Sequence, residues 1–331
     1  MFLYNFINKI ANLISSNLKK ILIIGVAIIG FYSIILSFSD LNLVSDQLIN
    51  FKIEYLPIIL ALVTLGWFIL FARWQILLRN SNIIIPPKSS FGIYISGFSL
   101  TFIPGEVGEF LKSQLLKNRF NIPRSKTSPI VITELFYNAL GLVALSVTSI
   151  WFFEFTVYIF IIFSIVLILA FYLINNKKYF FKAINKFSKI RFLKKYTESM
   201  SESIELIQSL TRGRVLFYSV ILSIFFWFVE CVAIHLLLLS FGIDSVELLT
   251  LVSMYTASII LGVITFLPLG IGVFEGSMAG FLSLHGIDIT VSLTVVILAR
   301  IVTRWYSIFV GLAVLKITGG LSSPSSEKSI D

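Results

Sequence analysis

The sequence predicts an all-α integral membrane protein with about six spanning helices and two re-entrant broken hairpins in an inverted-topology repeat. Its composition is the first observation behind this prediction: of 331 residues, 57% are hydrophobic and 13% are charged, whereas soluble proteins average about 25% charged residues. A soluble domain of this size cannot bury so much apolar surface, because much of its exterior must remain polar. With one Cys and two His, a disulfide framework or a zinc site is not expected, and neither is a cofactor.

Apolar runs long enough to cross a bilayer, about 20 residues each, are the second observation. They are residues 21–38, 55–78, 128–152, 155–174, 215–240 and 290–315. Residues 1–20 place their apolar side chains on one helical face, which predicts an interfacial helix before the first span. No small-residue cleavage site follows that span, so an uncleaved anchor is expected rather than a signal peptide. The whole chain, 1–331, is expected to be one multi-pass membrane domain with a tail at 317–331.

The distribution of charge is the third observation, and it predicts the orientation. The net charge is +9, and residues 175–214 contribute +7 of it through ten basic side chains and three Glu. If both termini are cytoplasmic, this basic loop and every other Lys and Arg outside the membrane except Lys52 face the cytoplasm. The outer loops then carry acidic residues, and the positive-inside rule accounts for the arrangement in a cell-membrane protein. The rule explains the basic loop without nucleic acid, so no nucleic-acid partner is expected.

Two further apolar segments, 90–116 and 246–285, are interrupted by Pro and Gly. Basic residues flank the first segment at both ends, and acidic residues flank the second. A single full crossing of 90–116 would place one basic cluster outside, so each segment is predicted to enter and leave on the same side. The expected positions of the two breaks are Pro104, Gly105, Gly108, Pro268, Gly270 and Gly272.

The two interrupted segments also resemble each other. Phe102–Phe110 and Phe266–Phe274 share the pattern Phe-[Ile/Leu]-Pro-x-x-[Val/Ile]-Gly-x-Phe, and Gly141–Leu145 is similar to Gly311–Leu315. On the predicted topology the two halves run in opposite senses, an organisation with paired broken helices that is typical of secondary transporters. The alternative is a scaffold protein with two Pro-kinked helices. The two repeats are expected at residues 55–152 and 215–315.

Charged side chains at membrane depth cost about 2.5 kcal/mol or more each, and they usually face a cavity or a partner. The residues expected to bind substrate are Arg300, Glu275, Glu134, Glu109, Lys112 and Glu106. Arg300 lies near the middle of its span and needs either a carboxylate, with Glu275 and Glu134 as the expected partners, or an anionic ligand. A closed pair would be structural, and an open arginine near half-helix N-termini would be a phosphate site.

The remaining ionisable residues have simpler expected roles. Glu109 and Lys112 are three residues apart, so on a helix they share a face and either pair with each other or bind ligand. Arg73 and Arg304 lie toward the cytoplasmic ends of their spans, where they are expected to snorkel to the membrane interface.

These motifs resemble the lysylphosphatidylglycerol synthase transmembrane-domain family, also called the flippase-like domain family. Pro104–Lys112 is similar to the family's Pro-Gly-x-x-Gly-Glu-x-x-[Arg/Lys], and Pro268–Glu275, followed by Arg300, is similar to its Pro-x-Gly-x-Gly-x-x-Glu. Where the family often has Glu-Arg-x-x-Asp, this chain has Glu134-Leu135-Phe136-Tyr137-Asn138. In the bacterial multiple peptide resistance factor, a domain of this kind is associated with moving aminoacylated phosphatidylglycerol between leaflets. The resemblance implies that this chain is the membrane module without the aminoacyl-transferase domain.

The sequence favours a lipid translocator over two alternatives. A membrane phospholipid or lipid-linked head group would enter a polar cavity between the halves, with Arg300 and Lys112 on its phosphate. Glu109, Glu134 and Glu275 would hold a cationic moiety or a coupling proton. No Walker A pattern is present, so ATP hydrolysis is not supported. The alternatives are a membrane-embedded enzyme acting on a lipid-linked sugar or phosphate, for which no catalytic motif is found, and an accessory subunit. The accessory subunit would recruit a separate soluble enzyme through the 175–214 loop, a segment that an anionic lipid surface suits better.

Overall fold

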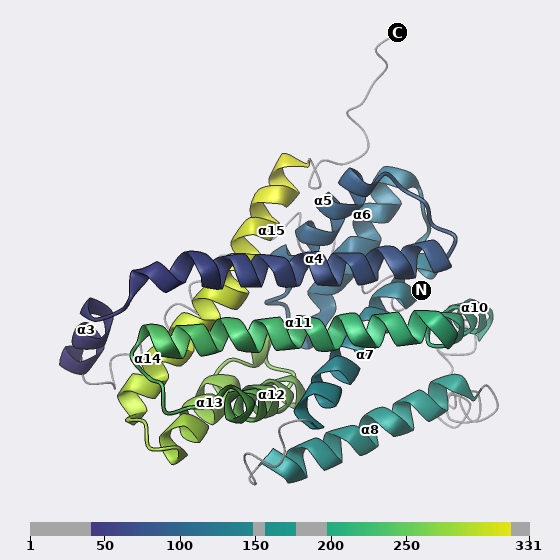
Figure 1. Cartoon of the computed structure of the whole chain (residues 1–331). Helices are drawn as coiled ribbons and strands as arrows, with labels where there is room; N and C mark the ends of the chain where they lie inside the picture. The colour runs from purple at the N-terminus through teal and green to yellow at the C-terminus, as the bar shows by residue number, and fades with distance from the viewer. Residues whose placement is uncertain (1–40, 148–155, 177–196, 319–331) are drawn as a thin grey trace.

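The computed structural model describes residues 41–147, 156–176 and 197–318, and every regular element within these ranges is helical (Figure 1). Five helical stretches there are long and apolar enough to span a membrane, which confirms the prediction of an all-α, multi-pass membrane protein. The first stretch, Ile53–Asn80, contains α4 (Leu56–Asn80). The others are α7 (Arg124–Val147), α8 (Val157–Asn175), α11 (Gly213–Ser240) and the stretch Ile289–Ile317. The predicted interfacial helix 1–20, the predicted first span 21–38, residues 177–196 of the basic loop and most of the tail lie outside the described residues.

The two longest helices, α4 and α11, lie side by side along most of their length and form the centre of the molecule (Figure 1). Pro57 lies in the first turn of α4, where a missing N–H breaks no helical hydrogen bond. Helix α7 packs against α11, and α10 (Thr197–Leu210) packs against α7. In contrast, α8 is largely exposed. Its exposed apolar side chains suit contact with lipid. Its backbone suits the same environment, because a helix satisfies its backbone hydrogen bonds internally.

The first interrupted segment forms two helices joined by a break. Helix α5 (Pro87–Gly97) leads into the short turn η2 (Phe98–Leu100), and the chain returns through the 3-10 segment η3 (Pro104–Phe110) to α6 (Leu111–Phe120), which packs against α5. The segment is close-packed at Gly108, where an added Cβ would overlap the carbonyl of Leu100.

The second interrupted segment is built in the same way. Helix α12 (Leu248–Ile264), the 3-10 turn η7 (Pro268–Gly270) and α13 (Val273–Leu284) form a pair of packed helices around a break. Gly270 has a φ of +66°, and an added Cβ there would lie 2.7 Å from the Cα of Gly262. This position requires glycine both for its backbone conformation and for the close approach of α12.

The two breaks share part of their local backbone geometry, and Phe266, Leu269 and Gly272 add left-handed residues in the second one. Pro104 and Pro268 each begin a 3-10 turn, and the residue before each is extended, because a proline disfavours the helical conformation of its predecessor. Two residues later the backbone is left-handed in both, with φ of 59° at Glu106 and 66° at Gly270. The turns η3 and η7 contact each other, so the two breaks meet inside the molecule.

The last spanning stretch is interrupted rather than regular. Helix α14 (Ile289–Arg300) and helix α15 (Tyr306–Ile317) are joined by a π-helical turn, η8 (Ile301–Trp305). The apolar run predicts one span at 290–315 here, and the structure inserts the π turn directly after Arg300. Such turns occur frequently at functional sites.

Candidate functional site

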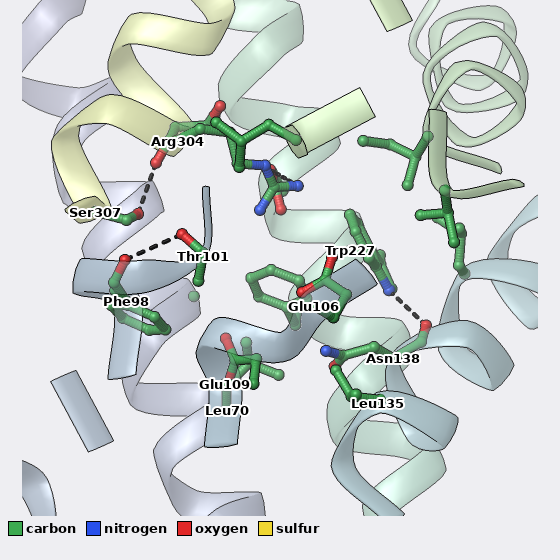
Figure 2. A pocket seen from close by; sticks show the side chains of 18 of the residues that line it. Leu70, Phe98, Thr101, Glu106, Glu109, Leu135, Asn138, Trp227, Arg304 and Ser307 are labelled. Atoms are coloured by element: carbon green, nitrogen blue, oxygen red, sulfur yellow. Dashed lines mark hydrogen bonds and ion pairs between the residues drawn. The ribbon is translucent and has the colours of Figure 1, made fainter. Parts of the chain in front are cut away.

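A cavity of about 330 Å³ lies between the two halves, where both breaks meet the central helices (Figure 2). Its walls come from α4, α7, α11 and η8, and residues of both breaks reach into it. The charged residues that line it are Arg73, Glu106, Glu109, Lys112, Glu134, Glu230, Arg300 and Arg304. Acidic and basic side chains are equal in number among these residues, so the cavity is strongly polar but has no net formal charge.

Lys112 is the centre of a buried cluster in the first half. Its Nζ lies 2.6 Å from Glu109 Oε2 and 2.7 Å from Glu134 Oε2. The same ammonium group also lies 5.2 Å from the centre of the Trp74 ring and 5.0 Å from that of Tyr94, which are cation–π contacts. Glu109 and Lys112 therefore form the pair that was one of the two expectations for them, and both also line the cavity. The expectation that Glu134 would partner Arg300 is wrong, because α7 packs against α6 and presents Glu134 to Lys112.

Arg300 forms a closed pair in the second half. Its Nε donates to Glu275 Oε1 at 2.9 Å, an Nη2 donates to the Leu269 carbonyl at 2.8 Å, and the guanidinium stacks 3.7 Å from the centre of the Phe274 ring. The other oxygen of Glu275 accepts the backbone N–H of Gly272 at 2.6 Å. Because Glu275 lies in the first turn of α13, it joins the end of α14 to the start of α13. Glu275 therefore holds Arg300 in position in the cavity wall, although Glu275 itself does not line the cavity.

Arg73 and Arg304 were expected to snorkel to the membrane interface, but both turn inward. The Arg73 side chain is 1% exposed, donates to Ser223 Oγ at 2.6 Å and lies 3.9 Å from Glu134. Arg304 lies 3.2 Å from Glu230 Oε1, which also accepts from the Tyr255 hydroxyl at 2.7 Å. Both arginines turn inward because carboxylates on neighbouring helices are available to pair with them.

The two halves carry the same pairing with the charges exchanged. In the first half a cation beside the break, Lys112, meets a carboxylate on the next long helix, Glu134. In the second half the carboxylate Glu275 is beside the break, and the cation Arg300 is on the next helix. The sequence marks each of these residues as ionisable at depth, but the exchange becomes visible only when partners are assigned in space.

Several buried polar atoms around the cavity have no hydrogen-bond partner among the described residues. They are Arg73 Nε, Glu134 Oε1, Asn138 Oδ1 and Glu230 Oε2. Buried polar atoms are normally paired, so these atoms are available to water or to a ligand. Asn138 stands where the related motif often has Asp, and its backbone carbonyl accepts the Trp227 indole N–H at 2.9 Å (Figure 2).

Glu106 differs from the other cavity carboxylates. It is exposed to the cavity rather than buried, and it lies between Arg304 and Glu109, with which it interacts electrostatically (Figure 2). The structure thus brings five of the six predicted substrate residues to the cavity. Sequence reasoning did not include Arg73, Glu230, Arg304 and Asn138 in this site. The sequence places Arg73 and Arg304 at depths similar to those of carboxylates on other spans, and that correspondence could have identified both arginines as members of the site.

Residues 22–311 match the family model described as the lysylphosphatidylglycerol synthase TM region. The chain belongs to this family. That assignment confirms the resemblance expected from the Pro104–Lys112 and Pro268–Glu275 motifs. Within the family match lie both breaks and every charged residue of the cavity.

Two relatives that are similar to this member of the lysylphosphatidylglycerol synthase TM family are named as membrane proteins. A UPF0104 membrane protein of Methanothermobacter thermautotrophicus is 30% identical over 122 residues, which cover 37% of this chain and 35% of the relative. A UPF0104 membrane protein of Methanocaldococcus jannaschii is 24% identical over 297 residues, which cover 82% of this chain and 87% of the relative. The match thus spans about a third of the first relative's length and most of the second's.

Proposed function

We propose that this protein is a lipid translocator that moves an anionic or aminoacylated phospholipid, or a lipid-linked head group, between the leaflets of the cell membrane. The observation that carries the proposal is a cavity lined by charged side chains between apolar helices, with both helix breaks at its edge. A head group placed there would exchange its hydration for charged and hydrogen-bonding side chains. Its acyl chains would remain in the bilayer.

The paired breaks support a transport mechanism over a scaffold. Substrate sites of secondary transporters lie where discontinuous helices from two repeats meet, and here η3 and η7 contact each other beside the cavity. Their shared backbone geometry supports an inverted repeat with two re-entrant hairpins. In this proposal the termini are cytoplasmic and the chain carries out no covalent chemistry. Movement is downhill or coupled to an ion.

A reconstitution experiment tests the translocator directly. The purified protein is placed in liposomes that contain fluorescent phosphatidylglycerol or phosphatidylcholine, and dithionite is added to quench outer-leaflet dye. A translocator brings inner-leaflet lipid within reach of dithionite, so the quenched fraction of the anionic lipid rises above that of protein-free liposomes. No increase with any lipid would contradict the proposal.

A matched pair of substitutions tests whether the cavity is the route. Ala139 lines the cavity from α7, and Ala313 is exposed on α15 away from it. Ala139→Trp fills the cavity and should reduce the transport rate by about tenfold or more, since a bulky side chain excludes a head group from a space of this size. Ala313→Trp should leave the rate unchanged. Equal rates in the two variants would exclude the cavity as the pathway.

A further inference from the structure

We propose that Arg304 is the anion-binding residue of the cavity and that it takes the phosphate of the lipid head group. This inference rests on the proposed function for the identity of the ligand. It starts from the surface that each cationic side chain leaves open. The Arg304 side chain is 27% exposed, whereas those of Arg73, Lys112 and Arg300 are 1%, 3% and 5% exposed.

The three other cations of the cavity are paired and almost fully buried, and the Arg73 Nε that has no hydrogen-bond partner is itself buried. Lys112 is held between two carboxylates, and Arg300 is held by a carboxylate, a carbonyl and an aromatic ring. Arg73 is buried between Ser223 and Glu134. A phosphate would have to break buried ion pairs to reach any of them, which is strongly unfavourable because a buried carboxylate would lose its cation.

Arg304 is positioned to exchange one partner for another. It lies in the π turn η8, its guanidinium carbon is 5.9 Å from the Trp227 ring, and its carboxylate partner is Glu230 at 3.2 Å. Glu230 has a second donor in the Tyr255 hydroxyl, so it remains partly satisfied when Arg304 turns away. The guanidinium has five N–H donors in a planar fork that matches two phosphate oxygens.

The surroundings of Arg304 also favour a head group over a bare anion. Glu106 interacts electrostatically with Arg304 and is exposed to the same cavity, so an isolated anion would meet a neighbouring carboxylate. A head group that carries hydroxyl or amine donors beside its phosphate would satisfy both side chains. Glu230 acts as an internal competitor that occupies Arg304 when no phosphate is bound.

Calorimetric titration of the detergent-purified full chain tests this assignment without requiring transport. The probes are dihexanoyl-phosphatidylglycerol below its micellar concentration, the free head group glycerophosphoglycerol, and inorganic phosphate. Arg304→Gln should weaken binding of the lipid by about tenfold or more, because charge-assisted hydrogen bonds are lost. Arg304→Lys, which keeps the charge but loses the fork, should weaken it by about threefold.

Glu230→Gln distinguishes a binding role from a structural one. If Glu230 competes with phosphate for Arg304, removing its charge should tighten lipid binding by about threefold or more. A merely structural Arg304–Glu230 pair predicts the reverse, since breaking it would loosen the site. If Arg304→Gln does not fold, Arg304→Lys and Glu230→Gln still have opposite expected effects. Unchanged affinity in those two variants overturns the assignment.

The probes and the transport assay separate this inference from the proposed function. Binding of inorganic phosphate alone, without the lipid or its head group, overturns the lipid assignment. Arg304-dependent lipid binding without any lipid transport supports the site and contradicts the translocator. Transport with normal lipid binding by Arg304→Gln supports the translocator and overturns the role of Arg304.

Discussion

At the scale of single residues, Glu106 is the charged residue of the cavity whose backbone is left-handed, as it also is at the apolar cavity residues Phe266 and Leu269. Its φ of 59° is left-handed, a conformation that costs about 1–2 kcal/mol for a residue with a Cβ. The corresponding position of the second break, Gly270, has a similar φ of 66°, which glycine adopts without that cost. Strained backbone concentrates at functional sites. Because this carboxylate is exposed to the cavity, we expect its charge to take part in the proposed transport.

We expect Glu106→Gly to be more stable than Glu106→Ala by about 1 kcal/mol, because only the glycine relieves the left-handed backbone. Both substitutions remove the carboxylate, so both should reduce lipid transport to the same extent. Thermal unfolding in detergent measures the first effect, and dithionite quenching measures the second. An alanine variant as stable as the glycine variant would show that the backbone there is unstrained.

At the scale of elements, buried ion pairs tie each break to the long helix that follows it. Lys112 at the start of α6 joins α7 through Glu134, and Glu275 at the start of α13 joins α14 through Arg300. A break interrupts the regular hydrogen bonds of a helix, so its position depends on such side-chain contacts. These pairs therefore fix the edges of the cavity.

Lys112→Met should lower the free energy of unfolding by about 3 kcal/mol, because it leaves the buried Glu134 and the neighbouring Glu109 without their shared cation. Adding Glu134→Gln removes one uncompensated charge, so the double variant should lose less stability than the sum of the single variants. Chemical denaturation of all four proteins of this cycle in detergent measures the coupling. Strictly additive losses would mean that the two residues do not interact.

At the scale of the whole molecule, the cavity lies where the two interrupted segments meet the central helices. Neither break forms the site alone: Glu106, Glu109 and Lys112 come from the first half, and Glu230, Arg300 and Arg304 come from the second. Helices α4 and α11 pack together along the junction (Figure 1). The halves are expected to rock about this junction, exposing the cavity to each leaflet in turn.

Cysteine labelling with a membrane-impermeant maleimide tests the topology behind this mechanism. In a Cys231→Ala background, Lys88→Cys and Lys126→Cys flank the first interrupted segment, and Asp244→Cys and Asp288→Cys flank the second; all four positions are exposed. We expect the first pair to react from the cytoplasmic face and the second pair from the outer face, as re-entrant segments require. Opposite sidedness within either pair would mean that the segment crosses the membrane completely.

The extent to which this protein is predictable from its sequence differs between its parts. Apolar run length identified the five spanning stretches in the described residues, since the thickness of a bilayer sets that length directly. The breaks at Pro104 and Pro268 follow from local chemistry, because proline restricts its own φ and the conformation of the residue before it. The family match covers residues 22–311, which include both motifs.

Partner choice within the cavity required the tertiary structure. The sequence alone determined that the chain is a multi-pass helical membrane protein with charged residues at depth and two interrupted segments. It did not determine that Glu134 pairs with Lys112, that Arg73 and Arg304 turn inward, or that a π turn follows Arg300. Each of these depends on how a helix is rotated and at what depth it packs against its neighbours. A few tens of degrees of helix rotation carry a side chain from one partner to another without any change in hydrophobic pattern, so only the packed molecule decides them.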